Sequence, residues 1–257
     1  MPARQVWAGG PVTDRATCVL EGNAGPMTLD GTNTWVLAAP GSDEAVVIDP
    51  GEDDRAHRAA VAAVLAGRRV ALVVGTHRHR DHVGGLDAFL ARHPAPVARA
   101  AGEHRAAGLH LRVLATPGHT SDSVCVLLDT GELLTGDTLL GRGSTVIATG
   151  VEQGVEQGGD VGDHLRSLDL LLSLDVDVVL PGHGPVVQDP RAALTRQREH
   201  RLARLEQVRR ALAAGHRDVD EIVTAVHGDL DGGVEGTLRW AAAQSIRAQL
   251  DYLARQP

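Results

Sequence analysis

The chain has 257 residues, which is enough for one large globular domain or for one domain with a smaller appendage. Hydrophobic residues make up 43% of the chain and aromatic residues only 2%, so we expect a core of Ala, Val and Leu and no aromatic surface for stacking bases or sugars. The formal net charge of -8 argues against a protein that coats nucleic acid through its overall field, although it allows a local basic patch.

The two cysteines and the N-terminal segment indicate the cellular compartment of the protein. Cys18 and Cys125 are too few for a disulfide framework, which fits a reducing compartment. The N-terminus lacks a charged start followed by an apolar stretch, and the sequence has no run of about 18 apolar residues. We therefore expect a cytoplasmic protein that does not contact a membrane.

Residues 1–189 show the pattern of a mixed α/β domain, because short apolar runs alternate with loops rich in Gly, Pro and Asp. Helical patterns lie between these runs at Asp54 to Ala66 and Asp163 to Leu174. The predicted strands are Thr34 to Ala39, Ala45 to Ile48, Val70 to Val74, Leu111 to Ala115, Val124 to Leu128, Glu132 to Leu134 and Asp177 to Leu180.

A turn at residues 129–132 (Asp-Thr-Gly-Glu) predicts a hairpin between the strands that end near Asp129 and begin near Glu132. The segment before the first strand and the segment after the second should then meet at one end. An exact repeat of four residues, Val-Glu-Gln-Gly at 151–154 and 155–158, is too short for a structural repeat. We expect residues 150–162 to form a mobile loop at the rim of the site.

Residues 190–257 form a helical region of three segments. The first predicted helix, Arg191 to Ala214, ends at Gly215. Asp218 and Glu221 have the spacing of a capping box before a second helix, and a third is predicted from about Leu238 to Ala254.

The most informative motif is the segment Thr76-His77-Arg78-His79-Arg80-Asp81-His82. His77 and His79 alternate along an extended loop, so both imidazoles can face one ion, while Asp81 and His82 can serve a neighbouring ion. Spacing alone thus favours two metal ions.

Three further candidate ligands each follow an apolar strand: His119, Asp137 and His183. The predicted hairpin brings the loops of His119 and Asp137 to the same end of a sheet, as shared ligation requires. Seven candidates at four junctions between a strand and a loop predict a dinuclear centre.

In order and context, these residues resemble the metallo-β-lactamase superfamily, whose fold is an αββα sandwich with the metal site on its rim. The resemblance implies that His77, His79 and His119 bind the first metal, that Asp81, His82 and His183 bind the second, and that Asp137 bridges them. The antibiotic-degrading branch has a Cys where this chain has Asp137, so β-lactam hydrolysis is disfavoured. Zinc is the expected metal, with Mn²⁺ or Fe²⁺ as alternatives, because the donors are nitrogen and oxygen.

A closer resemblance covers nearly the whole chain. Residues 23–37, with Gly25-Pro26-Met27-Thr28-Leu29-Asp30-Gly31-Thr32-Asn33-Thr34, are similar to the entry segment of the β-lactamase-like protein 2 family. The resemblance implies a catalytic domain over 1–189 and a C-terminal winged-helix-like domain over 190–257. That family includes a single-stranded RNA endonuclease, which makes RNA a candidate substrate.

The predicted chemistry is hydrolysis by a metal-bridging hydroxide, with Asp81 and Asp137 as the catalytic carboxylates. Asp81 can orient the hydroxide or take its proton. Hydroxyls in the turn after His119 can bind a phosphate or an oxyanion, or can cap that turn; these are Thr120, Ser121 and Ser123.

Three functions remain open at this point. The first is hydrolysis of a phosphodiester in single-stranded RNA, or of an ester; seven Arg against two Glu between residues 191 and 215 support phosphate contact. The second is a thioesterase resembling glyoxalase II, since a thiolate leaves without a proton donor. The third is a nucleic-acid-binding protein with a vestigial metal site.

Overall fold

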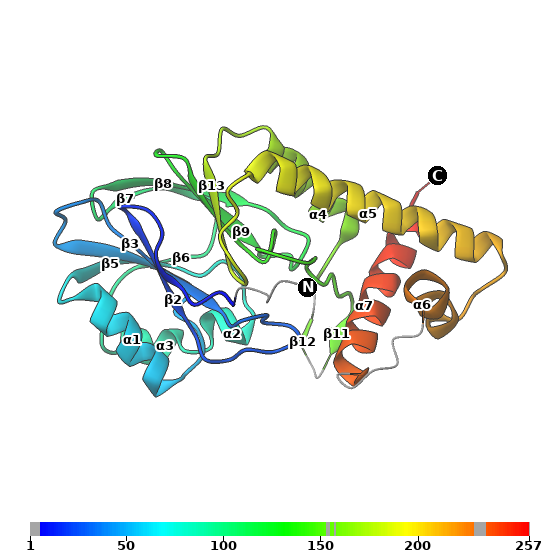
Figure 1. Cartoon of the computed structure of the whole chain (residues 1–257), viewed down its shortest axis with the longest axis horizontal. Helices are drawn as coiled ribbons and strands as arrows, with labels where there is room; N and C mark the ends of the chain where they lie inside the picture. Colours follow the sequence, from blue (N-terminus) through cyan, green and yellow to red (C-terminus); the bar gives the residue numbers. More distant parts are fainter. Residues whose placement is uncertain (1–5, 153–154, 157, 229–234, 257) are drawn as a thin grey trace. The chain divides into compact units, whose positions relative to one another are not determined.

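The computed structural model describes residues 6–152, 155–156, 158–228 and 235–256 (Figure 1). The chain divides into two compact units. The first contains the residues up to Ala115, Asp122–Gly143 and Asp175–Pro190, and the second contains Thr116–Ser121, Ser144–Leu174 and the residues from Arg191 onward. The helices after Pro190 thus share a unit with two earlier segments, and the predicted boundary at 189/190 remains a prediction.

The first unit contains a mixed six-stranded sheet whose strand order follows the sequence. Its members β2, β3 and β4 are antiparallel, whereas β4, β5 and β6 run parallel. The strands are β1 (Gly10–Pro11), β2 (Ala16–Leu20), β3 (Asn33–Leu37), β4 (Glu44–Ile48), β5 (Arg69–Val74) and β6 (Val97–Ala98).

The second sheet of this unit has the order β13-β10-β9-β8-β7. The predicted hairpin is confirmed, because β9 and β10 pair antiparallel with Leu133 opposite Leu127. In this sheet only β10 and β13 run parallel, so their carboxyl ends lie side by side. The strands are β7 (Gly102–Ala106), β8 (Leu109–Ala115), β9 (Val124–Leu128), β10 (Glu132–Gly136) and β13 (Val178–Pro181).

Apolar side chains from both sheets form one buried core, in which Trp35 is the single fully buried aromatic and Val, Leu and Ala fill most of the rest. A second core covers the other face of the first sheet, where Val61 and Leu65 of α1 (Arg55–Leu65) and Phe89 of α3 (Leu86–Leu90) pack against strand residues. Figure 1 shows α1 and α3 along this face. The composition-based prediction of a core made of small aliphatic residues is therefore confirmed.

The carboxyl ends of parallel strands position the loops that carry the candidate ligands of this unit. β4 and β5 end together, with Ile48 opposite Val74, so Asp49 and the segment 76–82 begin side by side. This segment includes the short helix α2 (Arg80–Val83), which carries Asp81 and His82. At the hairpin, Val124 donates a backbone hydrogen bond to Thr76 O (2.8 Å), which brings the start of β9 next to His77.

The regular elements among the described residues of the second unit are four helices and one short hairpin. Its helices are α4 (Val161–Leu172), α5 (Pro190–Ala213), α6 (Val219–His227) and α7 (Glu235–Ala254). The predicted cap is confirmed, since the Asp218 side chain accepts from the backbone N–H groups of Asp220 and Glu221. Beyond Pro190 the described residues contain helices and no strand, and residues 229–234 lie outside the described part, so the winged-helix-like prediction is not confirmed.

Several predictions about individual elements need correction. The four-residue repeat pairs as two short antiparallel strands, β11 (Val151–Glu152) and β12 (Val155–Glu156), within the region that we expected to form a mobile loop; residues 153, 154 and 157 lie outside the described residues. The fourth helix begins two residues before the predicted Asp163 because Asp160 caps it, accepting from Asp163 N. No described helix is long and apolar enough to cross a membrane.

Candidate metal centre

Asp81, His82, Asp137 and His183 converge in the first unit. The Nε2 atoms of His82 and His183 lie 3.2 Å apart, and both rings are fully buried. Asp81 Oδ2 lies 3.2 Å from His183 Nε2 and 3.5 Å from His82 Nε2, while Asp137 Oδ1 lies 3.4 Å from His82 Nε2 and 3.5 Å from His183 Nε2. Two imidazole nitrogens and two carboxylates therefore surround one point.

The backbone that delivers these groups leaves little room for change. Gly136, at the end of β10, has φ +47°, and a Cβ there would lie 2.5 Å from Thr76 Oγ1. A Cβ on Gly182 would lie 2.7 Å from Asp137 Oδ1 and 2.8 Å from His82 Cε1. Glycine is thus required at both positions, because Gly136 lies against Thr76 and Gly182 lies against Asp137 and His82.

The other nitrogen of each imidazole in this cluster is already engaged. His82 Nδ1 lies 2.7 Å from Asp49 Oδ2, and His183 Nδ1 lies 3.2 Å from the Gly31 carbonyl oxygen. Because both partners are acceptors, each Nδ1 carries the proton and each neutral ring has a lone pair on Nε2. Two lone pairs 3.2 Å apart repel unless a cation lies between them, which is the arrangement found around metal ions.

Asp49 organises this arrangement and was missed in the sequence analysis. Its Oδ1 accepts from Thr76 N (2.7 Å) and its Oδ2 accepts from Thr76 Oγ1 (2.6 Å) as well as from His82. The signal available in the sequence is an aspartate directly after a buried parallel strand, and Asp137 follows its strand in the same way. No histidine lies beside Asp49 in the chain, so the spacing of the motif does not single it out.

His77 and His79 form a second group in the same unit. His77 Nδ1 lies 3.1 Å from Thr76 Oγ1, and His77 Nε2 lies 2.9 Å from His79 Nδ1. The Thr76 hydroxyl donates to Asp49, so it accepts from His77 Nδ1 and leaves Nε2 with a lone pair. The ligand atoms of His77, His82 and Asp137 also lie within 4.8 Å of one another, as do those of Asp81, His82 and His183.

His119 belongs to the second unit, in the segment Thr116–Ser121. Its Nδ1 lies 2.7 Å from the Val146 carbonyl oxygen and 3.0 Å from Thr145 Oγ1. The carbonyl fixes the proton on Nδ1, so this imidazole also has a lone pair on Nε2. Among the hydroxyls predicted to bind substrate, Thr120 and Ser123 are buried and Ser121 is exposed.

Electrostatics favour a cation at the buried cluster. Burial opposes charge on the His82 imidazole, but Asp81, Asp137 and Asp49 outweigh it and raise the pKa of His82 well above its usual range. Burial likewise opposes charge on Asp137, yet His183 and His82 hold the pKa of Asp137 well below its usual range. For the same reasons the pKa of Asp81 falls to about 2 and that of His183 rises to about 9. In a carboxylate field of this strength, a metal ion and protons compete for the same imidazoles.

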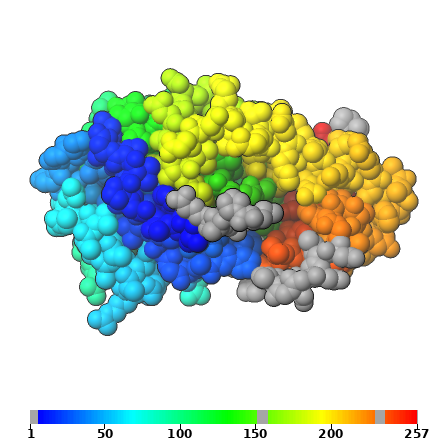
Figure 2. Space-filling view, in the orientation of Figure 1, coloured from blue at the N-terminus to red at the C-terminus, as the bar shows by residue number. Residues whose placement is uncertain are grey.

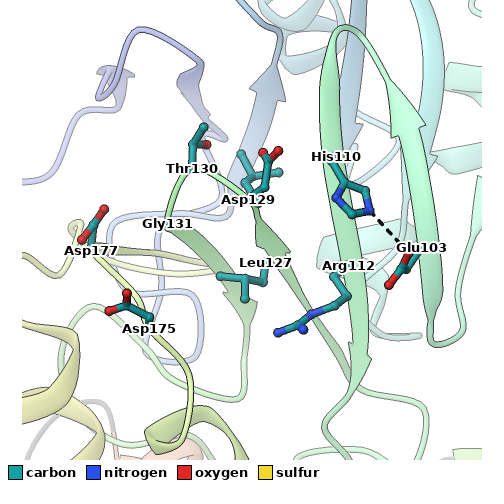
Figure 3. A pocket seen from close by; sticks show the side chains of 10 residues that line it. Glu103, His110, Arg112, Leu127, Asp129, Thr130, Gly131, Asp175 and Asp177 are labelled. Carbon is teal, nitrogen blue, oxygen red and sulfur yellow. Dashed lines mark ion pairs between the residues drawn. The ribbon is translucent and has the colours of Figure 1, made fainter.

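Other hollows of the first unit lie away from these residues. A cavity of about 450 Å³ borders the turn between β9 and β10, and Figure 3 shows Asp129, Asp175 and Asp177 around it. Another, of about 420 Å³, lies over Phe89 and is edged by Arg55, Arg58 and Arg92. Neither is lined by a candidate metal ligand, so neither bears on the predicted chemistry.

The chain resembles known proteins in both sequence and fold. The sequence model of the metallo-beta-lactamase superfamily matches residues 27–111 and 102–183. The chain belongs to the metallo-beta-lactamase superfamily. A solved structure of a beta-lactamase domain protein from Burkholderia ambifaria has the same fold, with a TM-score of 0.80 at 20% identity over 98% of this chain and 90% of that one.

Two curated relatives that span most of this chain have different names. An atrochrysone carboxyl ACP thioesterase from Aspergillus fumigatus is 31% identical over 87% of this chain and 76% of the relative. A beta-lactamase-like protein 2 homolog from Caenorhabditis elegans is 28% identical over 95% of this chain and 85% of the relative. The chain is thus a metallo-beta-lactamase-fold protein with a His-rich metal site, and its homologues include ACP thioesterases.

Proposed function

We propose that the protein is a dinuclear metal-dependent hydrolase that acts on acyl thioesters. The observation that carries the proposal is the buried cluster, in which His82 Nε2 and His183 Nε2 face Asp81 and Asp137 at 3.2–3.5 Å. Two divalent ions, when bound, supply Lewis acidity and lower the pKa of water towards neutrality. Nitrogen and oxygen donors suit Zn²⁺ and also accept Mn²⁺ or Fe²⁺.

We assign the metal ligands from the imidazole nitrogens that carry a lone pair. His77 and His79 would hold the first ion together with His119, whose Nδ1 is engaged in the same way as those of His82 and His183. Asp81, His82 and His183 would hold the second ion, and Asp137 would be shared. Asp81 has the more exposed side chain of the two carboxylates, 24% against 11%, and is therefore the better placed to orient water.

Two observations favour a thioester over RNA. A thiolate leaves without a proton donor, whereas the 5′-oxygen of RNA is a poorer leaving group that is helped by one. In addition, several arginines of α5 that could contact phosphate are engaged within the chain. Arg198 pairs with Asp169, Arg210 pairs with Glu206, and Arg201 is buried. Figure 2 shows α5 in yellow and orange, and acidic side chains pair with some of its arginines.

RNA hydrolysis is the second candidate, supported by the similarity to a beta-lactamase-like protein 2 homolog over 95% of the chain. Its phosphate contacts would rest on the remaining arginines of α5, among them Arg191 and Arg196. Binding of RNA without cleavage is the third candidate.

The deciding experiment incubates zinc-loaded protein with an acyl thioester of N-acetylcysteamine, single-stranded RNA, a lactone and a β-lactam. Release of free thiol at a rate that disappears on dialysis against a chelator and returns with Zn²⁺ is the expected result. Cleavage of RNA with no thiol release would replace the proposal by the second candidate. Tight, salt-sensitive RNA binding in a gel shift, with no turnover of any substrate in Zn²⁺ or Mn²⁺, would remove the enzyme proposal.

A further inference from the structure

A loop of the second unit, residues 144–148, is held by two buried polar side chains of α5. Gln197 Nε2 donates to Ser144 Oγ (3.0 Å), and the Arg201 guanidinium donates through NH2 to the carbonyl oxygen of Thr145. Gln197 and Arg201 are four residues apart and so lie on one face of the helix. Both are buried, with exposed fractions of 6% and 5%.

The same loop contacts His119 from its other side. Thr145, whose carbonyl accepts from Arg201, places its hydroxyl 3.0 Å from His119 Nδ1, and the next carbonyl, that of Val146, lies 2.7 Å from the same nitrogen. Arg201 therefore binds the residue next to Val146, whose carbonyl fixes the proton on His119. A continuous path of contacts runs from α5 through the loop to the imidazole.

The remaining contacts of the loop and of the segment around His119 leave both little freedom. Ile147 is fully buried in an apolar cluster with Leu165 and Leu205. The carbonyl of Gly118, next to His119, accepts from Asp160 N (2.9 Å), and a Cβ on Gly118 would lie 2.4 Å from the Cα of His164. The N-terminus of α4 thus supports one side of the His119 segment, while α5 and the loop support the other.

Arg201 is a costly residue in this position. A buried guanidinium is stable only when its donors are satisfied, and a carboxylate partner normally provides this. In the described ranges no carboxylate pairs with Arg201, and its Nε has no hydrogen-bond partner. Burial and the neighbouring Arg204 lower the pKa of Arg201 to about 10, which still leaves it charged at neutral pH. An apolar residue would avoid burying a charge but would leave the Thr145 carbonyl oxygen without this donor, so what the arginine supplies here is its bond to the loop.

We propose that Arg201 is a positioning residue for the metal centre: it fixes the 144–148 loop so that the Val146 carbonyl orients the His119 imidazole, with Nε2 towards the first metal ion. This inference rests on the proposed function, in which His119 is a ligand of that ion. It gives the C-terminal helices a role in metal binding that does not depend on the substrate. Partners of metal-bound histidines typically contribute about 10–100-fold to metal affinity.

The test compares zinc affinities of Arg201→Met, Arg201→Lys and the matched control Arg198→Met with those of the wild type, by competition with a chromophoric chelator. Arg198 lies one turn earlier on α5, has a side chain that is 38% exposed and pairs with Asp169. We expect two zinc ions per chain in the wild type and in R198M. In R201M the first ion should bind about tenfold or more weakly, while the second keeps its affinity. R201K retains a donor for the Thr145 carbonyl and should fall between them.

The double variant H119A/R201M separates positioning from general damage. If Arg201 acts through His119, adding R201M to H119A causes no further loss of affinity. Equal affinities in R201M and the wild type, a parallel loss at both ions, or additive losses in the double variant would overturn the inference. Should R201M not fold, R201K and its combination with H119A are judged by the same criteria. If the wild type binds fewer than two ions, or H119A loses neither, it is the proposed function that fails.

Discussion

The buried cluster of the first unit and His119 of the second unit fix imidazoles in the same way but with different parts of the chain. His82 and His183 are oriented by Asp49 and by the Gly31 carbonyl, which lie at or beside strand ends. His119 is oriented by the Val146 carbonyl, in a loop that α5 holds in place. The first cluster should therefore depend on the two sheets, and His119 on the loop and helices of the second unit.

The largest effect should come from the residue proposed to be shared by both ions. Replacing Asp137 by Ala removes a largely buried carboxylate that faces His82 and His183. Turnover should fall by about 10³-fold or more, because both ions lose a ligand. Steady-state rates on the substrate that the wild type turns over, together with metal content per chain, check this.

A matched control is available at the other end of the same hairpin. Asp129 follows β9, is exposed beside the cavity in Figure 3 and lies away from the candidate ligands. Asp129→Ala should retain wild-type turnover and metal content. Full activity in D137A would show that the site is wrongly assigned.

A second prediction concerns the support of His119 by α4. Gly118 has φ +141°, and a Cβ there would lie 2.4 to 2.5 Å from backbone and Cβ atoms of His164. Gly118→Ala should lower the free energy of unfolding by about 2–4 kcal/mol, since neither backbone can move away easily. Urea unfolding measures the change.

Gly143→Ala is the control for backbone strain alone, because Gly143 also has positive φ (+74°) but a Cβ added there would meet no atom within 4 Å. It should cost about 1 kcal/mol. Equal losses in the two variants would mean that the close approach to His164 contributes nothing.

A third prediction tests how Asp49 orients His82. In Asp49→Asn the amide oxygen still accepts the hydrogen bond from Thr76 N, which turns the amide N–H₂ group towards His82 Nδ1. Because this group donates, it favours the His82 tautomer whose proton is on Nε2. Zinc affinity of the second site should fall about 10–100-fold. Chelator competition measures it, with the exposed Asp43→Asn as control; unchanged affinity in D49N would show that the Nδ1 contact does not set the tautomer.

Asp49 also marks how far sequence reasoning reached. Regular patterns predicted most of the buried strands, though not β2, as well as the β9–β10 hairpin and the order of the candidate ligands, because alternation, turn residues and strand-end position are local signals. Asp49 acts only through the pairing of β4 with β5, which no local pattern reveals. The same holds for β7, a polar edge strand identified only by its partner β8.

Arg201 was missed for a related reason. In the sequence it is one of seven arginines in a polar helix, and nothing distinguishes it from the others as a candidate phosphate contact. Only packing separates it from them, since Arg201 is 5% exposed whereas the side chain of Arg210 is 76% exposed. Burial within a helix of low amphipathicity depends on the neighbouring loop, which composition does not encode.

The smallest expected effect concerns Glu21, a buried carboxylate of the first unit that accepts from Glu52 N and Asn23 Nδ2. Burial, with help from the nearby charges of Glu52 and Asp81, raises the pKa of Glu21 to about 7. A raised carboxyl pKa means that Glu21 contributes stability below its usual pKa of 4.5 and loses that contribution as pH rises through 7. The wild type should therefore lose stability over this interval relative to Glu21→Gln.

Urea unfolding at pH 5 and pH 8 measures this difference, in chelator because a cation near Asp81 would itself lower the pKa of Glu21. Relative to the wild type, E21Q should gain about 1–2 kcal/mol between the two pH values. The exposed Glu199→Gln should show no such gain. A constant difference between E21Q and the wild type would mean that Glu21 is ionised at both pH values in the absence of metal, because donors such as the Glu52 N–H hold its charge.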